Sequence, residues 1–149
     1  MITYKYAKNK FMVRILRVNQ MPIRENTNTE EFDVLYRGGD DTNPKFLWLS
    51  TSRLYAENYA GKNNKVFLYK VPILILDRLV DCKVIPDYLN PNCDDETPEY
   101  EPENYDVDRL IKDNYTGYYF YEDEYECLCV CLFKKALKYK LEGKQIPLM

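Results

Sequence analysis

Hydrophobic and polar residues alternate along the first half of the chain in a pattern that predicts short strands. Lys65 to Val71 alternates between two faces and is closed by a proline. Val34 to Tyr36 and Phe46 to Leu49 are two further short strands, and a glycine pair breaks the chain after the first of them. The segment 10–18 alternates poorly, although the spacing of its apolar residues favours a strand there as well.

A helix is predicted between the second and third of these strands. Ser50, Thr51 and Ser52 supply N-cap candidates, and Gly61 is a C-cap candidate. The residues from Ser52 to Ala60 then form a helix of about two and a half turns. Tyr55 and Tyr59 lie four residues apart and therefore share one face of it.

The second half of the chain predicts further short elements around an acidic connection. The apolar run 73–80 is compatible with a strand or a short helix. Residues 86–104 contain four prolines and no basic residue, which indicates an acidic loop or insertion. Residues 106–113 read as a short helix, whereas 118–121 and 126–133 read as the last two strands. Strands dominate and no strand–helix–strand repeat occurs, so the fold class is α+β.

Composition restricts the chemistry that this protein can perform. The chain has 149 residues, a length typical of a single domain spanning 1–149. It contains 15 tyrosines, whose polar tips suit half-buried sheets and sites. It contains no histidine, which excludes a Ser-His-Asp triad, a Cys-His pair and a histidine metal ligand. No metal site is predicted.

The five cysteines predict buried thiols in a reducing compartment. No CxxC pair is present, and Cys127, Cys129 and Cys131 alternate along one predicted strand and share a face. Their odd number and the lack of a signal peptide favour the cytoplasm, or the cytosol of a host cell. The apolar runs are too short for a membrane span, so no membrane contact is expected.

The charge is unevenly distributed along the chain. Residues 87–126 hold 14 acidic side chains and two basic ones, Arg109 and Lys112, while the rest of the chain is basic. This is not the uniform basic field of a nucleic-acid binder. The distribution could guide an anionic ligand to the basic half, or let the acidic loop meet a basic protein partner.

The motifs of residues 34–71 resemble those of the ADP-ribosyltransferase fold when taken in order. Tyr36-Arg37-Gly38, a strand, Ser50-Thr51-Ser52 and a helix ending in Glu-Asn-Tyr-Ala match that arrangement. The resemblance implies two small packed antiparallel sheets with short helices, and NAD as the substrate. In the branch with an Arg, Ser-Thr-Ser and Glu signature, Arg37 would be a catalytic-site residue and the Ser50–Ser52 turn would order the site.

The poly(ADP-ribose) polymerase branch resembles the chain at other positions. Trp48 and Tyr59 have the spacing of the two rings that sandwich nicotinamide in that branch, with Tyr55 on the same helix face as Tyr59. The resemblance implies that the backbone of Gly38 binds the nicotinamide amide. The histidine of that branch is replaced by Arg37, so its catalytic triad is incomplete here.

The resemblance also requires a glutamate at the start of a late strand. Glu124 and Glu126 form a Glu-x-Glu pair ahead of Cys127, and on a strand both would point the same way. Glu122 and Asp123 remain alternatives. A carboxylate is needed because cleavage of the nicotinamide–ribose bond creates an oxocarbenium-like centre. In another alignment the glutamate position falls near Cys129, which would make the protein a catalytically silent nucleotide- or protein-binding module.

The same residues also have plainer explanations. Arg37 could form a surface ion pair, the Ser50–Ser52 turn could act only as a helix cap, and Trp48 and Tyr59 could be core residues. The acidic residues 122–126 could be a solvated hairpin tip. A third hypothesis is therefore a small α+β structural or interaction protein that is unrelated to nucleotide chemistry.

Overall fold

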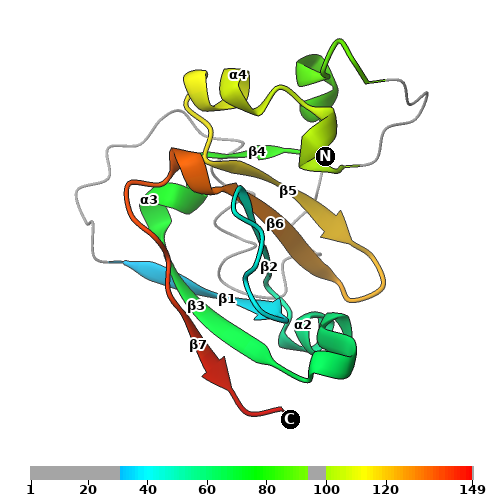
Figure 1. Cartoon of the computed structure of the whole chain (residues 1–149), viewed down its shortest axis with the longest axis vertical. Helices are drawn as coiled ribbons and strands as arrows, with labels where there is room; N and C mark the ends of the chain where they lie inside the picture. The colour runs from blue at the N-terminus through cyan, green and yellow to red at the C-terminus, as the bar shows by residue number, and fades with distance from the viewer. Residues whose placement is uncertain (1–30, 94–99, 149) are drawn as a thin grey trace.

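The computed structural model describes residues 31–93 and 100–148, and it has the α+β character expected from the sequence. Seven strands form one mixed sheet in the order β4-β5-β6-β2-β1-β3-β7, with short helices around it (Figure 1). Among the described strands, only β4 and β5 pair in parallel. The strands are β1 (Phe32–Gly38), β2 (Phe46–Ser50), β3 (Val66–Pro72), β4 (Leu79–Asp81), β5 (Gly117–Glu122), β6 (Cys127–Phe133) and β7 (Gly143–Ile146).

The expectation of two packed sheets is wrong, because β1 and β2 join the strands into one sheet. They pair antiparallel at Tyr36 and Ser50, the one register pair between them in the described chain. By contrast, β1 pairs with β3 from Phe32 to Gly38, and β2 pairs with β6 along its whole length. The sheet is therefore continuous but joined at its centre by a single pair. The residues that follow Tyr36 in β1 and those that precede Ser50 in β2 are not paired with each other.

The helix predicted for Ser52 to Ala60 is confirmed as α2 (Arg53–Ala60), and it continues into the 3-10 helix η2 (Gly61–Asn63). The other helices are α3 (Ile73–Leu76), α4 (Val107–Lys112) and the 3-10 helices η3 (Ile85–Tyr88), η4 (Pro102–Asn104) and η5 (Lys134–Ala136). Among the described residues, no helix is long and apolar enough to cross a membrane.

Several segments differ from the sequence-based expectation. The ambiguous run 73–80 divides into α3 and the start of β4, and the basic C-terminal segment contributes the edge strand β7. The described part of the acidic loop is anchored, since Leu89 and Tyr105 form an antiparallel bridge. The strand predicted for 10–18 lies outside the described residues.

The sheet buries a hydrophobic cluster on each face, and the two clusters follow the alternation of β6. Leu128, Val130 and Leu132 belong to one cluster, whereas Cys131 and Phe133 belong to the other. Cys127, Cys129 and Cys131 are buried and free of disulfides, as their spacing predicts. The thiol side chains of these three cysteines therefore lie on one face of β6. That face is near α2 at one end of the strand and near α4 at the other.

The N-cap of α2 gives a first testable prediction. The Ser52 hydroxyl oxygen accepts a hydrogen bond from the amide of Tyr55 at 3.0 Å. We expect Ser52→Ala to lower the free energy of unfolding by about 1 kcal/mol, because an amide of the first turn loses its acceptor. Urea unfolding measures the change, and Ser52→Thr should stay close to the wild type. An equal loss of stability in Ser52→Ala and Ser52→Thr would contradict the role of the Ser52 hydroxyl as the N-cap of α2.

Candidate functional site

A cavity of about 150 Å³ lies where β1 and β2 diverge beneath α2. Its wall combines residues from both strands with the tyrosine face of the helix, and β5 and β6 complete it. Six of the predicted site residues meet there: Arg37, Gly38, Trp48, Ser50, Tyr55 and Tyr59. Thr51, Ser52, Glu124 and Glu126 are not in the wall.

Gly38 allows α2 to lie directly on β1. A Cβ atom at this position would overlap the carbonyl oxygen of Ala56 and lie 2.7 Å from the amide nitrogen of Ala60. Both alanines are buried, so the small residues of strand and helix form one close contact. The next residue, Gly39, has a φ of 86°, a conformation that glycine adopts without strain. The glycine pair therefore sets the position of the helix above the cavity.

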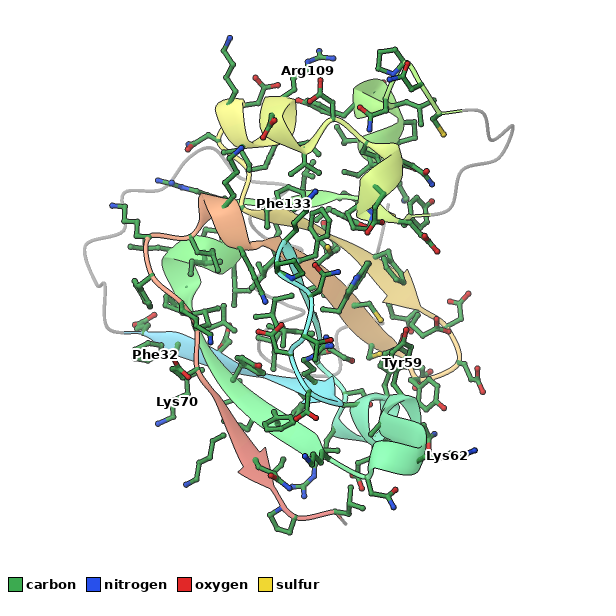
Figure 2. All side chains as sticks on the ribbon, in the orientation of Figure 1. Phe32, Tyr59, Lys62, Lys70, Arg109 and Phe133 are labelled. Carbon is green, nitrogen blue, oxygen red and sulfur yellow. The ribbon has the colours of Figure 1, made fainter. Side chains whose placement is uncertain are left out.

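The aromatic residues form a wall and a rim rather than a closed core. Trp48 is half-buried and makes edge contacts with Tyr118 and Phe120, at centroid distances of 5.9 and 6.1 Å. Tyr59 is 74% exposed and stacks on Tyr55 at 5.9 Å. The stick view shows Tyr59 on α2 beside the β5–β6 turn (Figure 2). Tyr59 is therefore not a core residue, and its ring is accessible to a ligand.

Arg37 holds the loop after β1 against β2. Its guanidinium donates to the carbonyl oxygen of Asp40 at 2.9 Å and 3.3 Å and to that of Trp48 at 3.2 Å. These bonds use three of its five N–H donors and leave the others for the cavity. Within the described part of the chain, the hydrogen bonds of Arg37 are thus with backbone oxygens rather than with a carboxylate.

Each residue of the Ser50–Ser52 turn has a structural partner. Ser50 accepts a hydrogen bond from the amide of Ser52 at 3.0 Å, and its hydroxyl lies 3.5 Å from the sulfur of Cys127. Thr51 accepts from the amide of Leu128, which ties the turn to β6. Ser52 acts as the helix cap, as one explanation of the motif predicts. Ser50 alone of the three also faces the cavity.

Cys129 occupies the part of the wall formed by β6. It pairs with Ser50 on β2 and with Phe120 on β5, and all three residues line the cavity. Its hydrogen bond to Cys127, together with burial, raises the pKa of Cys129, and the same bond lowers the pKa of Cys127. Cys129 is therefore a neutral thiol at physiological pH and provides no negative charge.

The candidate carboxylates lie in two different parts of the β5–β6 hairpin. Glu124 and Glu126 are exposed in the β5–β6 turn, and the φ of Glu126 is 46°, so the expectation that both lie on a strand and point the same way is wrong. Glu122 instead ends β5, two residues beyond Phe120 and opposite Cys127. Because strand side chains alternate, Glu122 shares the face of Phe120, which lines the cavity.

The pKa of the Tyr55 hydroxyl is raised by its burial in the cavity wall and by the groups around it. Burial, then the Cys129 thiol, and more weakly Tyr59 and Glu122 raise the pKa of Tyr55. This phenol is therefore a neutral hydrogen-bond donor at physiological pH. Glu122, at the end of β5, makes the weakest of these contributions.

The turn between β5 and β6 is fastened to α2. The Tyr125 ring meets the Tyr55 ring edge-on at 5.2 Å, and its hydroxyl oxygen accepts from the Asn58 amide nitrogen at 2.6 Å. These contacts fix the hairpin that carries the acidic residues beside the mouth of the cavity. In the part of the chain that the structure describes, no group of three or more His, Cys, Asp or Glu residues is arranged to hold a metal.

The wall also includes residues that sequence reasoning did not select. Tyr36, Leu49, Ala56 and Phe120 belong to it. The alternation of β1 could have indicated Tyr36, which shares a strand face with Gly38. It would have placed Leu49 on the face opposite to Trp48, and Phe120 depends on strand pairing across the sheet. Comparisons with known proteins found no matching family, no curated relative and no similar solved structure.

Proposed function

We propose that this protein is an NAD-dependent ADP-ribosyltransferase, with the nicotinamide and its ribose bound in the cavity between β1, β2 and α2. The observation that carries the proposal is the convergence of the motif residues. Arg37, Gly38, Trp48, Ser50, Tyr55 and Tyr59 come from three elements and line one cavity. The acceptor of ADP-ribose is not specified by these residues.

The size and chemistry of the cavity suit the nicotinamide end of the dinucleotide. A volume of about 150 Å³ is smaller than that of typical whole-ligand pockets, so the rest of NAD would extend over the open rim. Electron-rich rings such as Trp48 and Tyr59 attract a positively charged pyridinium ring. The phosphates would find the free N–H groups of Arg37 and the N-terminus of α2.

The reaction needs a negative charge rather than a proton-transfer group. Oxidised nicotinamide is already a cationic leaving group, and the ribose becomes oxocarbenium-like as the bond breaks. A carboxylate stabilises that centre electrostatically. We infer that Glu122 has this role, since it shares a strand face with Phe120 and influences Tyr55. Glu124 and Glu126 stay as the alternatives in the adjacent turn.

We further infer that the fold is a variant of the ADP-ribosyltransferase arrangement. Its two expected sheets would correspond to the halves β7-β3-β1 and β2-β6-β5-β4, which meet at Tyr36 and Ser50. The cavity lies at that junction, and residues 37–38 of β1 and 48–49 of β2 contribute to its wall. The weak junction supports this interpretation because it opens the sheet where a ligand would enter.

A second candidate function is a binding module that has lost catalysis. The wall of the cavity, among the described residues, includes no Asp or Glu, and the neutral Cys129 occupies its β6 side. This arrangement would still bind a nucleotide. The two functions differ in one observable, because only the enzyme releases nicotinamide from NAD.

Tyr59→Ala tests the binding site with little risk to the fold. Tyr59 is 74% exposed, so we expect a nearly unchanged melting temperature without ligand. The Kd for NAD, measured by calorimetry, should rise about tenfold because a stacking face is lost. Tyr139→Ala is the matched control, since Tyr139 is 58% exposed and does not line the cavity.

The outcomes separate the three hypotheses. Nicotinamide release that weakens in Tyr59→Ala supports the transferase, and NAD binding without release supports the silent module. If neither NAD nor ADP-ribose binds or raises the melting temperature of the wild type, both proposals fail. Equal loss of binding in the two tyrosine variants would also remove the cavity as the site.

A further inference from the structure

Aromatic side chains are concentrated around the cavity between β1, β2 and α2. Among the described residues, eleven line this cavity and five of these are aromatic, although aromatic residues make up only 15% of the chain. Tyr59 is 74% exposed and the other four are half-buried, so a ligand in the cavity can contact their rings. The five come from β1, β2, α2 and β5: Tyr36, Trp48, Tyr55, Tyr59 and Phe120.

Four of these rings form two walls that are already in place. Trp48 and Phe120 belong to the sheet, and their rings meet at 69° with centroids 6.1 Å apart. Tyr55 and Tyr59 belong to α2, and their rings stack at 22° with centroids 5.9 Å apart. Tyr125 of the β5–β6 turn meets Tyr55 edge-on at 5.2 Å. Because these contacts order the rings without a ligand, little binding energy is lost in arranging them.

The polar groups of the wall carry no negative charge. The described lining includes no Asp or Glu, and the thiol of Cys129 is neutral because its pKa is raised by its hydrogen bond to Cys127 and by burial. The positive charge of Arg37 is directed to the carbonyl oxygens of Asp40 and Trp48. A primary ammonium group would therefore find no carboxylate in the wall for its N–H donors, whereas a quaternary nitrogen has no N–H group to satisfy.

The surroundings of the mouth are acidic. Residues 122–126 of the β5–β6 hairpin include four acidic residues and no basic one. The hairpin lies beside Tyr59 and is fastened to α2 through Asn58 and Tyr125 (Figure 2). Its negative potential favours the approach of a cation to this side of the cavity.

We propose that this cavity is an aromatic cage for a compact quaternary ammonium group. Ring faces attract such a cation without a charged partner, and several rings around one site add to the attraction. The cavity volume of about 150 Å³ limits the group to a few atoms, so the rest of the ligand extends past the rim at Tyr59. The cationic nicotinamide of NAD is one member of this class. The inference does not depend on the transfer reaction, because an aliphatic cation needs only the rings.

The test compares choline with its uncharged isostere, in which a carbon atom replaces the nitrogen. Both are titrated into the full-length protein and followed by NMR. We expect choline to bind about tenfold or more tightly than the isostere, because the two differ only in charge. Tyr59→Leu should raise the Kd for choline about threefold, since it keeps an apolar side chain but removes a ring. Tyr59→Phe keeps the ring and should bind choline nearly as the wild type does.

Tyr139→Leu is the matched control, since Tyr139 is 58% exposed and does not line the cavity. An isostere that binds as tightly as choline, no binding of choline, or equal weakening in Tyr139→Leu and Tyr59→Leu would overturn the proposal. Equal losses in Tyr59→Phe and Tyr59→Leu would also overturn it. Nicotinamide release without choline binding would remove the cage and leave the proposed function standing. Choline binding without any binding of NAD would do the reverse.

Discussion

Gly38→Ala should lower the free energy of unfolding by about 3 kcal/mol or more, the upper end of what overpacking costs. The added methyl group would occupy the space of the Ala56 carbonyl oxygen and press on the amide of Ala60. Both obstacles are backbone atoms of α2, so no side-chain rotation relieves them. The helix must move away from β1, and the cavity between them must change shape.

Urea unfolding and NAD titration of the same variant measure these two effects. Gly61→Ala is the control, because a Cβ there meets no atom within 4 Å and only its φ of 55° opposes the change. We expect about 2 kcal/mol for that variant, because a φ of 55° with a ψ of −129° is a conformation that residues other than glycine rarely adopt. A Gly38→Ala protein as stable as the Gly61→Ala protein would refute the close packing of helix on strand.

Glu122→Gln should reduce the rate of nicotinamide release from NAD about 100-fold, the scale of losing one electrostatic contact to a transition state. Glutamine has the shape of glutamate but no charge. It also keeps an oxygen that can accept the amide of Glu124, which Glu122 binds at 3.2 Å. The variant should therefore fold normally and bind NAD with nearly the wild-type Kd, so that kcat falls and KM does not rise.

Glu124→Gln and Glu126→Gln serve as controls for charge in the same hairpin. Both residues are exposed in the turn, so each variant should keep its activity within a few-fold. A 100-fold loss in Glu124→Gln with an active Glu122→Gln would assign the role to the turn instead. If all three variants release nicotinamide like the wild type, no carboxylate of this hairpin acts in the reaction.

The local elements around the site were predictable because contiguous residues encode them. Alternation predicts β3, a short apolar run predicts β2, and the Ser52 cap with the Gly61 stop predicts α2 to within one residue. The hydroxyl of Ser52 and the glycine conformation act within a few residues of the chain. The convergence of Trp48 and Tyr59 on one cavity also follows from adjacent elements, β2 and α2, joined by a short turn.

The number of sheets was not predictable, since it depends on one backbone pairing. The strand patterns of β1 and β2 are the same whether the strands pair or separate. The contact of Tyr36 with Ser50 joins them. Register and pairing between distant strands are decided by tertiary contacts, which no local pattern contains.

Which carboxylate of the β5–β6 hairpin is closest to the site was also not predictable from the sequence. The sequence by itself determined that an acidic hairpin precedes Cys127, that no histidine takes part, and that the ring, glycine and hydroxyl residues follow in a fixed order. Tertiary structure decided that Glu122 ends a strand, because the left-handed Glu126 closes a turn and breaks the alternation. It also brought Cys129 and Phe120 to the cavity by pairing β6 with β2 and β5, since a side chain's direction depends on partners far away in the chain.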